Sequence, residues 1–242
     1  MNYSIFLNKA YQQFLLDLGG KKVPTPYRIN VPFQPDRRLY GKSDAKQLTQ
    51  DSKDISQEKG FDLNSASVEE IRKFMEENWL GIDCSGLAYH LLDNLLKKTG
   101  QGKMQKIGFP KASSTNVAKL TAPEFTEKVE GWEQVKPGDL IRLNSENADH
   151  ILIVLNSELK THNSYITYVH SSGITKTTGV HTGEIINGKF PEDLSVFSYN
   201  LSIAKISSSA SDLKNRKPSA YNGKTGDGIY RLKALTNPDV RT

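Results

Sequence analysis

The sequence is poor in cysteine and has no long apolar run. Cys84 is the single cysteine among 242 residues, which excludes an internal disulfide and a zinc site built from several cysteines. No stretch of about 18 apolar residues occurs, so we expect no transmembrane segment. Residues 1–18 lack the basic start of an export signal, and polar side chains interrupt their apolar ones. We expect an exported or cell-wall-associated protein if a signal has been removed, and otherwise a cytoplasmic one.

The chain also has little net charge outside its C-terminal end. The whole formal charge of +5 arises within residues 201–242, which hold eight basic and three acidic residues. A basic end of this kind attracts an anionic polymer such as cell-wall glycan, or it forms a solvated face with a basic loop at residues 207–227. The aromatic side chains on which bases stack are not interleaved with these residues, so no nucleic-acid partner is expected.

The order of helical and strand patterns predicts an α+β fold in one elaborated domain, residues 1–242. Apolar residues recur at helical spacing in residues 3–18, 67–75 and 84–98, and a short helix is expected at 123–129. Strand patterns follow at residues 140–143, 150–155, 164–170, 196–206 and 228–235. We therefore expect N-terminal helices that pack on a mostly antiparallel sheet.

Between the first two helices the periodicity is lost. Gly19 and Gly20 are expected to end the first helix, and four of the ten prolines fall in residues 21–35. Residues 42–60 are polar and show little periodicity, which predicts an extended loop or an insertion.

The lone cysteine lies where a helix is expected to begin. Asp83 is a good N-cap, so Cys84 becomes the first helical residue, beside unpaired backbone N–H groups and the positive end of the helix dipole. Both favour the nucleophilic thiolate, and Gly86 leaves room for a substrate to approach. A lone cysteine can also be a small buried apolar residue, and this alternative stays open.

A cysteine nucleophile needs a base, and two of the five histidines are placed to serve. His150 opens a strongly apolar strand and His170 ends the next, so antiparallel pairing can bring the two rings together. His150 would be the base and His170 would orient it. His90 is expected to point away from Cys84, and His181 lies in a turn-like segment. Each histidine of the pair, taken alone, could equally be a structural residue at a strand end.

We expect no metal and no cofactor. Asp149, His150 and His170 could be drawn as a zinc site, but no further ligand has a sensible spacing. The sequence also has no glycine-rich phosphate loop and no dinucleotide fingerprint.

Four segments, in this order, resemble the NlpC/P60 family of papain-like cysteine peptidases. They are Asp83-Cys-Ser-Gly-Leu87, Pro137-Gly-Asp-Leu140, His150-Ile-Leu-Ile-Val154 and Val169-His-Ser-Ser-Gly173, and they cover residues 80–175. The resemblance implies a papain-like fold with the nucleophile at a helix N-terminus and a Cys84–His150–His170 triad.

A fainter match, Thr25-Pro-Tyr-Arg28, makes Tyr27 a candidate for the oxyanion site. The resemblance also implies substrate-binding or oxyanion roles for Asp83 and Ser85. The chain departs from the family in that 56 residues separate Tyr27 from Cys84, which implies an inserted segment at residues 31–78, a lid or a cleft wall. Leu152 also replaces the small glycine that follows the family's histidine.

The resemblance implies a cysteine endopeptidase that hydrolyses bacterial cell-wall stem peptides, typically between D-γ-glutamate and a diamino acid. The expected partners are peptidoglycan or its muropeptide fragments, and the expected state is a monomer. A related papain-like amidase, acyltransferase or deamidase would use the same Cys/His pair. A third interpretation is a non-catalytic cell-wall-binding module.

Overall fold

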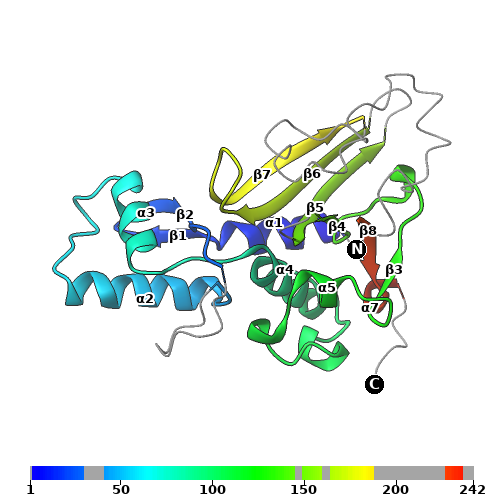
Figure 1. Ribbon diagram of the computed structural model, residues 1–242, viewed down its shortest axis with the longest axis horizontal. Helices are drawn as coiled ribbons and strands as arrows, with labels where there is room; N and C mark the ends of the chain where they lie inside the picture. The colour runs from blue at the N-terminus through cyan, green and yellow to red at the C-terminus, as the bar shows by residue number, and fades with distance from the viewer. Residues whose placement is uncertain (1, 30–40, 145–148, 160–163, 188–226, 237–242) are drawn as a thin grey trace.

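The computed structural model describes residues 2–29, 41–144, 149–159, 164–187 and 227–236 (Figure 1). The predicted strand at 196–206 lies outside these ranges. So do residues 31–40 of the inserted segment and the predicted basic loop, apart from Asp227.

Six described strands form one antiparallel sheet in the right-hand half of Figure 1. Its order is β3 (Thr126–Lys128), β8 (Gly228–Leu232), β4 (Leu140–Asn144), β5 (Asp149–Leu159), β6 (Ser164–Ser172) and β7 (Gly179–Ile186). Each pair of neighbours is antiparallel. The strands predicted at 140–143, 150–155 and 164–170 are therefore confirmed. The segment predicted at 228–235 is a strand at its start and then turns into α7 (Lys233–Thr236).

Helices precede most of the sheet in sequence, so the α+β class is confirmed. They are α1 (Tyr3–Gln12), α2 (Ala45–Glu58), α3 (Val68–Glu77), α4 (Cys84–Lys98) and the single turn α5 (Val117–Leu120). Short 3-10 turns cover Met104–Ile107, Ala112–Ser114 and Trp132–Gln134. None of the helices in the described ranges combines the length and the apolar character that crossing a bilayer requires.

Alternation along β5 builds two apolar clusters, one on each face of the sheet. Ile151 and Ile153 belong to the larger cluster, which contains the buried face of α4 and residues of α1, α2 and α3. Leu152 and Val154 belong to the smaller cluster, together with Ile166 of β6. Because successive strand residues point to opposite faces, the polar residues near the start of β5 are also divided between the two faces.

The first helix is shorter than its pattern predicts. It ends at Gln12, and residues 15–18 form β1 (Leu15–Leu18), which pairs with β2 (Lys21–Pro24). Gly19 and Gly20 have φ values of 58° and 73°, as a two-residue hairpin turn requires. The two glycines therefore turn a hairpin and do not end a helix.

The loop predicted at 42–60 is also wrong, because most of it is helix α2. Asp44 caps this helix, and its buried face contains Leu48 and Ile55, with Ser52 between them. One polar residue in that stripe leaves an apolar pattern too sparse to recognise. At the left of Figure 1, α2 and α3 lie beside the β1–β2 hairpin.

Two further local predictions fail in the second half of the chain. The helix expected at 123–129 is instead a turn followed by β3, which pairs with β8. The turn expected around His181 is strand β7 at the edge of the sheet. Thr182 and Glu184 of β7 are exposed, so the strand lacks the apolar alternation by which strands are recognised.

Candidate active site

Cys84 is the first residue of α4, as the sequence predicts, and Asp83 is the N-cap. The Gly86 N–H donates to Asp83 Oδ1 at 2.6 Å. The pairing of β5 with β6 ends at Ile153 and Val169. Beyond that pair, the Ile151 N–H of β5 donates a hydrogen bond to the sulfur of Cys84. The nucleophile candidate therefore lies beside the residue that follows His150.

The protonation of Cys84 differs from the expectation. Burial, reinforced by the negative charge of Asp83, raises the pKa of the thiol to about 12, although the Ile151 and Ser85 N–H groups and Lys42 act in the opposite direction. The side chain is 7% exposed. The helix dipole at this position favours the thiolate, but the desolvation of the thiolate outweighs it. The resting group is a neutral thiol.

His150 and His170 do come together, and a third histidine extends them. His150 Nε2 lies 2.7 Å from His170 Nδ1, and His170 Nε2 lies 2.7 Å from His181 Nε2. At the far end, the His181 Nδ1–H donates to the Gly179 carbonyl at 3.0 Å. We call these three rings and this carbonyl the histidine chain.

Burial keeps the first two rings of the histidine chain neutral. It lowers the pKa of His150 to about 3, and repulsion between the protonated forms of His150 and His181 adds a smaller contribution. It also lowers the pKa of His170 well below the usual range, helped by the two neighbouring rings. His170 is fully buried and its ring meets that of Tyr168 edge to face. The resting pair is therefore thiol and imidazole, not thiolate and imidazolium.

Tyr27 lies close to Cys84 and Asp83, and its oxyanion role stays a prediction. It forms a parallel bridge with Ile82, two residues before Cys84, and a Cβ on Gly173 would come within 2.4 Å of its ring. Burial raises the pKa of the phenol, and the nearby Cys84 and Asp83 raise it further. The hydroxyl therefore stays protonated and can donate a hydrogen bond.

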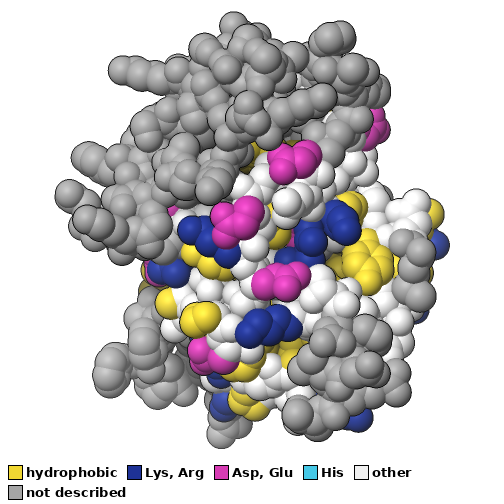
Figure 2. Space-filling view, turned by 90° about the vertical axis from the view of Figure 1, so that its right-hand side faces the viewer, with side chains coloured by type: hydrophobic (Ala, Val, Ile, Leu, Met, Phe, Trp, Pro, Cys, Tyr) yellow, Lys and Arg dark blue, Asp and Glu magenta, His cyan; other side chains and the backbone are white. Residues whose placement is uncertain are grey.

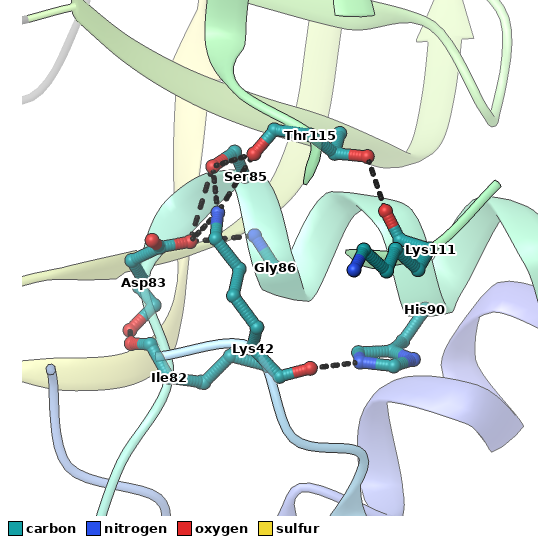
Figure 3. A network of polar contacts seen from close by, with 9 residues as sticks. Lys42, Ile82, Asp83, Ser85, Gly86, His90, Lys111 and Thr115 are labelled. Carbon is teal, nitrogen blue, oxygen red and sulfur yellow. Dashed lines mark hydrogen bonds and ion pairs between the residues drawn. The ribbon is translucent and has the colours of Figure 1, made fainter. Parts of the chain in front are cut away.

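A buried lysine that sequence reasoning missed holds Asp83 and Ser85 (Figure 3). Lys42 Nζ lies 2.8 Å from Asp83 Oδ1, and it also donates to Ser85 Oγ and, at 3.0 Å, to the Thr115 carbonyl. Lys42 is 2% exposed, and Asp83 and Ser85 are buried as well. We call these groups the lysine cluster. It gives Asp83 and Ser85 a structural role, whereas their contact with substrate stays a prediction.

The backbone beside Lys42 is fitted closely to α4. The His90 ring Nε2–H donates to the Lys42 carbonyl at 2.9 Å, so His90 points away from the nucleophile, as expected. The Asp83 N–H donates to the Gly41 carbonyl at 3.0 Å, and a Cβ on Gly86 would come within 2.3 Å of that oxygen. The space beside Gly86 therefore admits the Gly41 carbonyl and not, as expected, a substrate.

The inserted segment supports the site from a second side. Arg72 of α3 donates to the Thr178 carbonyl at 2.9 Å and to its hydroxyl at 3.2 Å, just before Gly179. Whether residues 31–78 also form a lid or a cleft wall stays a prediction. The described contacts make them a support for both the lysine cluster and the histidine chain.

The Pro137-Gly-Asp-Leu140 motif fixes the start of β4. Asp139 is buried, accepts from the Lys136 N–H, and receives two hydrogen bonds of 2.7 Å from Arg231 of β8. Lys233 donates to the Pro123 carbonyl, so both basic residues of 201–242 that the structure describes are engaged within the fold. On the face that Figure 2 shows, basic and acidic side chains are interspersed.

Local signals found Cys84, His150 and His170, but they could not find Lys42 or His181. Lys42 lies in a polar stretch, and no pattern marks a lysine whose ammonium will be buried. His181 has one signal, its separation from His170 across a hairpin, and the weak pattern of β7 obscured it. Comparison of the chain with protein-family models, with curated proteins and with solved structures finds no match to any of them.

Proposed function

We propose that this protein is a cysteine peptidase of the NlpC/P60 type that hydrolyses amide bonds in bacterial cell-wall stem peptides. The observations that carry the proposal are the contact of the Cys84 sulfur with the N–H of Ile151, the residue after His150, the 2.7 Å contact between His150 and His170, and the proximity of Tyr27 to Cys84. A nucleophile, a base with an orienting partner, and a neutral hydroxyl donor are the groups that acyl transfer requires.

The neutral resting pair sets the course of the reaction. His150 accepts the Cys84 proton as the sulfur attacks the amide carbonyl, so the imidazolium forms only with the tetrahedral intermediate. The Cys84 N–H at the start of α4 and the Tyr27 hydroxyl stabilise the oxyanion. His150 then protonates the leaving amine, and water hydrolyses the thioester with His150 again as base.

A cation close to Tyr27 suits a substrate that carries carboxylates. The guanidinium of Arg28 lies 3.3 Å from the centroid of the Trp79 ring, and Trp79 is 41% exposed. Stem peptides present carboxylates on both sides of the γ-glutamyl bond, and arginine binds carboxylates with two parallel hydrogen bonds.

Hydrolysis of purified muropeptides by the full chain tests the proposal. Cys84→Ala should abolish turnover, and His150→Ala should lower kcat by about 10²- to 10⁴-fold, the usual contribution of a general base. His170→Ala should cost less than His150→Ala. Glu184→Gln, an exposed change on β7, is the control and should leave the rate unchanged.

Unchanged hydrolysis by Cys84→Ala would refute the nucleophile assignment. A larger loss in His170→Ala than in His150→Ala would mean that the two histidines have the opposite roles. Product in which an added amine replaces water would favour the acyltransferase alternative, because the thioester would then be intercepted.

A further inference from the structure

The hydrogen bonds of the histidine chain all run in one donor-to-acceptor direction, and the Gly179 carbonyl oxygen determines that direction. The Gly179 carbonyl can only accept a hydrogen bond, so Nδ1 of His181 must carry a proton. In a neutral His181 ring, Nε2 then has the lone pair and accepts from His170 Nε2–H at 2.7 Å. This contact in turn leaves His170 Nδ1 as an acceptor.

The position of the proton on His150 follows from that on His170. Since His170 Nδ1 accepts, the 2.7 Å contact requires a proton on His150 Nε2. In the neutral ring of His150, Nδ1 therefore has the lone pair and is the atom able to take a proton. A hydrogen bond near the surface thus determines which nitrogen of a fully buried ring is basic.

The Gly179 carbonyl is itself held in place by tertiary contacts. Gly179 has a φ of +82°, and a Cβ there would come within 2.4 Å of the Thr25 carbonyl. The next residue, Val180, donates its N–H to that same Thr25 carbonyl at 2.8 Å, and Arg72 binds Thr178 on the other side. The acceptor that anchors the chain is therefore fixed by Thr25, the residue after β2, and by Arg72 of α3.

We propose that His181 is a positioning residue, which fixes the tautomer of His150 through His170 so that Nδ1 of His150 receives the proton of Cys84. The proposal rests on the proposed function for its consequence, but the tautomer itself can be observed without any substrate. His181 does not touch the reacting atoms and acts through His170.

Three substitutions at His181 separate a tautomer role from a packing role. The amide of His181→Gln can accept from His170 and donate to Gly179, so its rate should stay close to that of the wild type. His181→Phe fills the space without hydrogen bonds and should lose about tenfold in kcat, as loss of an orienting partner commonly does. The ammonium of His181→Lys only donates, which reverses the chain, and it should lose about 100-fold or more.

The direct readout is the ¹⁵N NMR spectrum of the histidine rings in the full chain, measured without substrate. In the wild type and in His181→Gln, Nε2 of His150 should be protonated and Nδ1 should not. In His181→Lys the two nitrogens should exchange roles. Glu184→Gln, which makes the same change of charge three residues along β7, should leave the spectrum as in the wild type.

Two results would overturn the proposal: a wild-type spectrum in which Nδ1 of His150 is protonated, or a His150 tautomer that His181→Lys leaves unchanged. Equal activity losses in the Gln and Lys variants would likewise refute it, because packing alone would then explain them. Failure of the proposed function is recognised separately, as an absence of muropeptide hydrolysis in a protein with the expected spectrum.

Discussion

The site contains two buried polar groups, the lysine cluster and the histidine chain, and they are stabilised in opposite ways. The lysine cluster neutralises the charge of Asp83 with the charge of Lys42, 2.8 Å away, and adds neutral oxygens around the ammonium. The histidine chain holds its buried rings neutral and joins them by contacts of 2.7 Å between ring nitrogens. The first group holds charges of fixed sign, and the second can receive a proton and pass it on.

The lysine cluster suits a structural task, and the histidine chain suits a chemical one. A buried ion pair with good hydrogen bonds is costly to break, so it suits the task of fixing the start of α4 beside Cys84. Neutral imidazoles can change their protonation within one hydrogen-bonded chain, which suits the base. The inserted segment supplies Lys42 to the first group, and its Arg72 binds Thr178, the residue before the carbonyl that ends the second.

The largest expected effect is on the lysine cluster. Lys42→Met leaves Asp83 buried without its cation and should lower the free energy of unfolding by about 3–5 kcal/mol. Urea denaturation measures this loss, and Lys46→Met, the same change at an exposed position of α2, should cost little. The double variant Lys42→Met/Asp83→Asn should lose less than the sum of the single losses, because the two partners are coupled. Additive losses would show that the ion pair does not hold the cluster together.

A smaller loss of stability is expected from Gly179→Ala, which alters the backbone at the carbonyl that ends the histidine chain. Alanine at position 179 would have a positive φ and a Cβ 2.4 Å from the Thr25 carbonyl. The substitution should therefore lower the free energy of unfolding by more than the roughly 1–2 kcal/mol that the positive φ alone costs. Gly20→Ala is the matched control, since Gly20 has a φ of +73° and open space around its Cβ position. Equal losses of unfolding free energy in the two variants would mean that the backbone of Gly179 is not tightly held.

Acid should weaken the histidine chain. Because the pKa of His150 is lowered from 6.5 to about 3 in the fold, the unfolded chain binds protons first. The contribution of His150 to stability is therefore complete above pH 6.5 and is lost as the pH falls from 6.5 toward 3. The urea midpoint of the wild type should fall over this range.

The variant His150→Asn should reduce that slope, measured from pH 4 to pH 8. His170 and His90 should retain part of it, because burial lowers the pKa of both. A slope unchanged by His150→Asn would mean that this ring is not buried in its neutral form.

The sequence predicts those parts of the site that local signals define. Asp83 as N-cap and Cys84 as first helical residue depend on neighbours within one turn. The pairing of His150 and His170 follows from two consecutive strands. These predictions hold because their physical causes act over short separations in the chain.

The remaining features depend on contacts between distant segments. Lys42 meets Asp83 across 41 positions, and nothing within residues 42–60 marks its burial. The protonation of Cys84 was predicted with the wrong sign, because a helix start can be recognised in sequence whereas the desolvation of its first residue cannot. His181 was assigned to a turn because an edge strand with one buried face lacks a strong pattern.

The most direct test of the account is intact-mass spectrometry of the full chain, acid-quenched during turnover of a stem peptide. Since Cys84 is the single cysteine, an acyl thioester has one site at which it can form. We expect the chain to gain the mass of the acyl fragment on the peptide that contains Cys84. The Cys84→Ala variant should show neither adduct nor product. Continued product formation by Cys84→Ala, with no adduct on the wild type, would contradict this expectation.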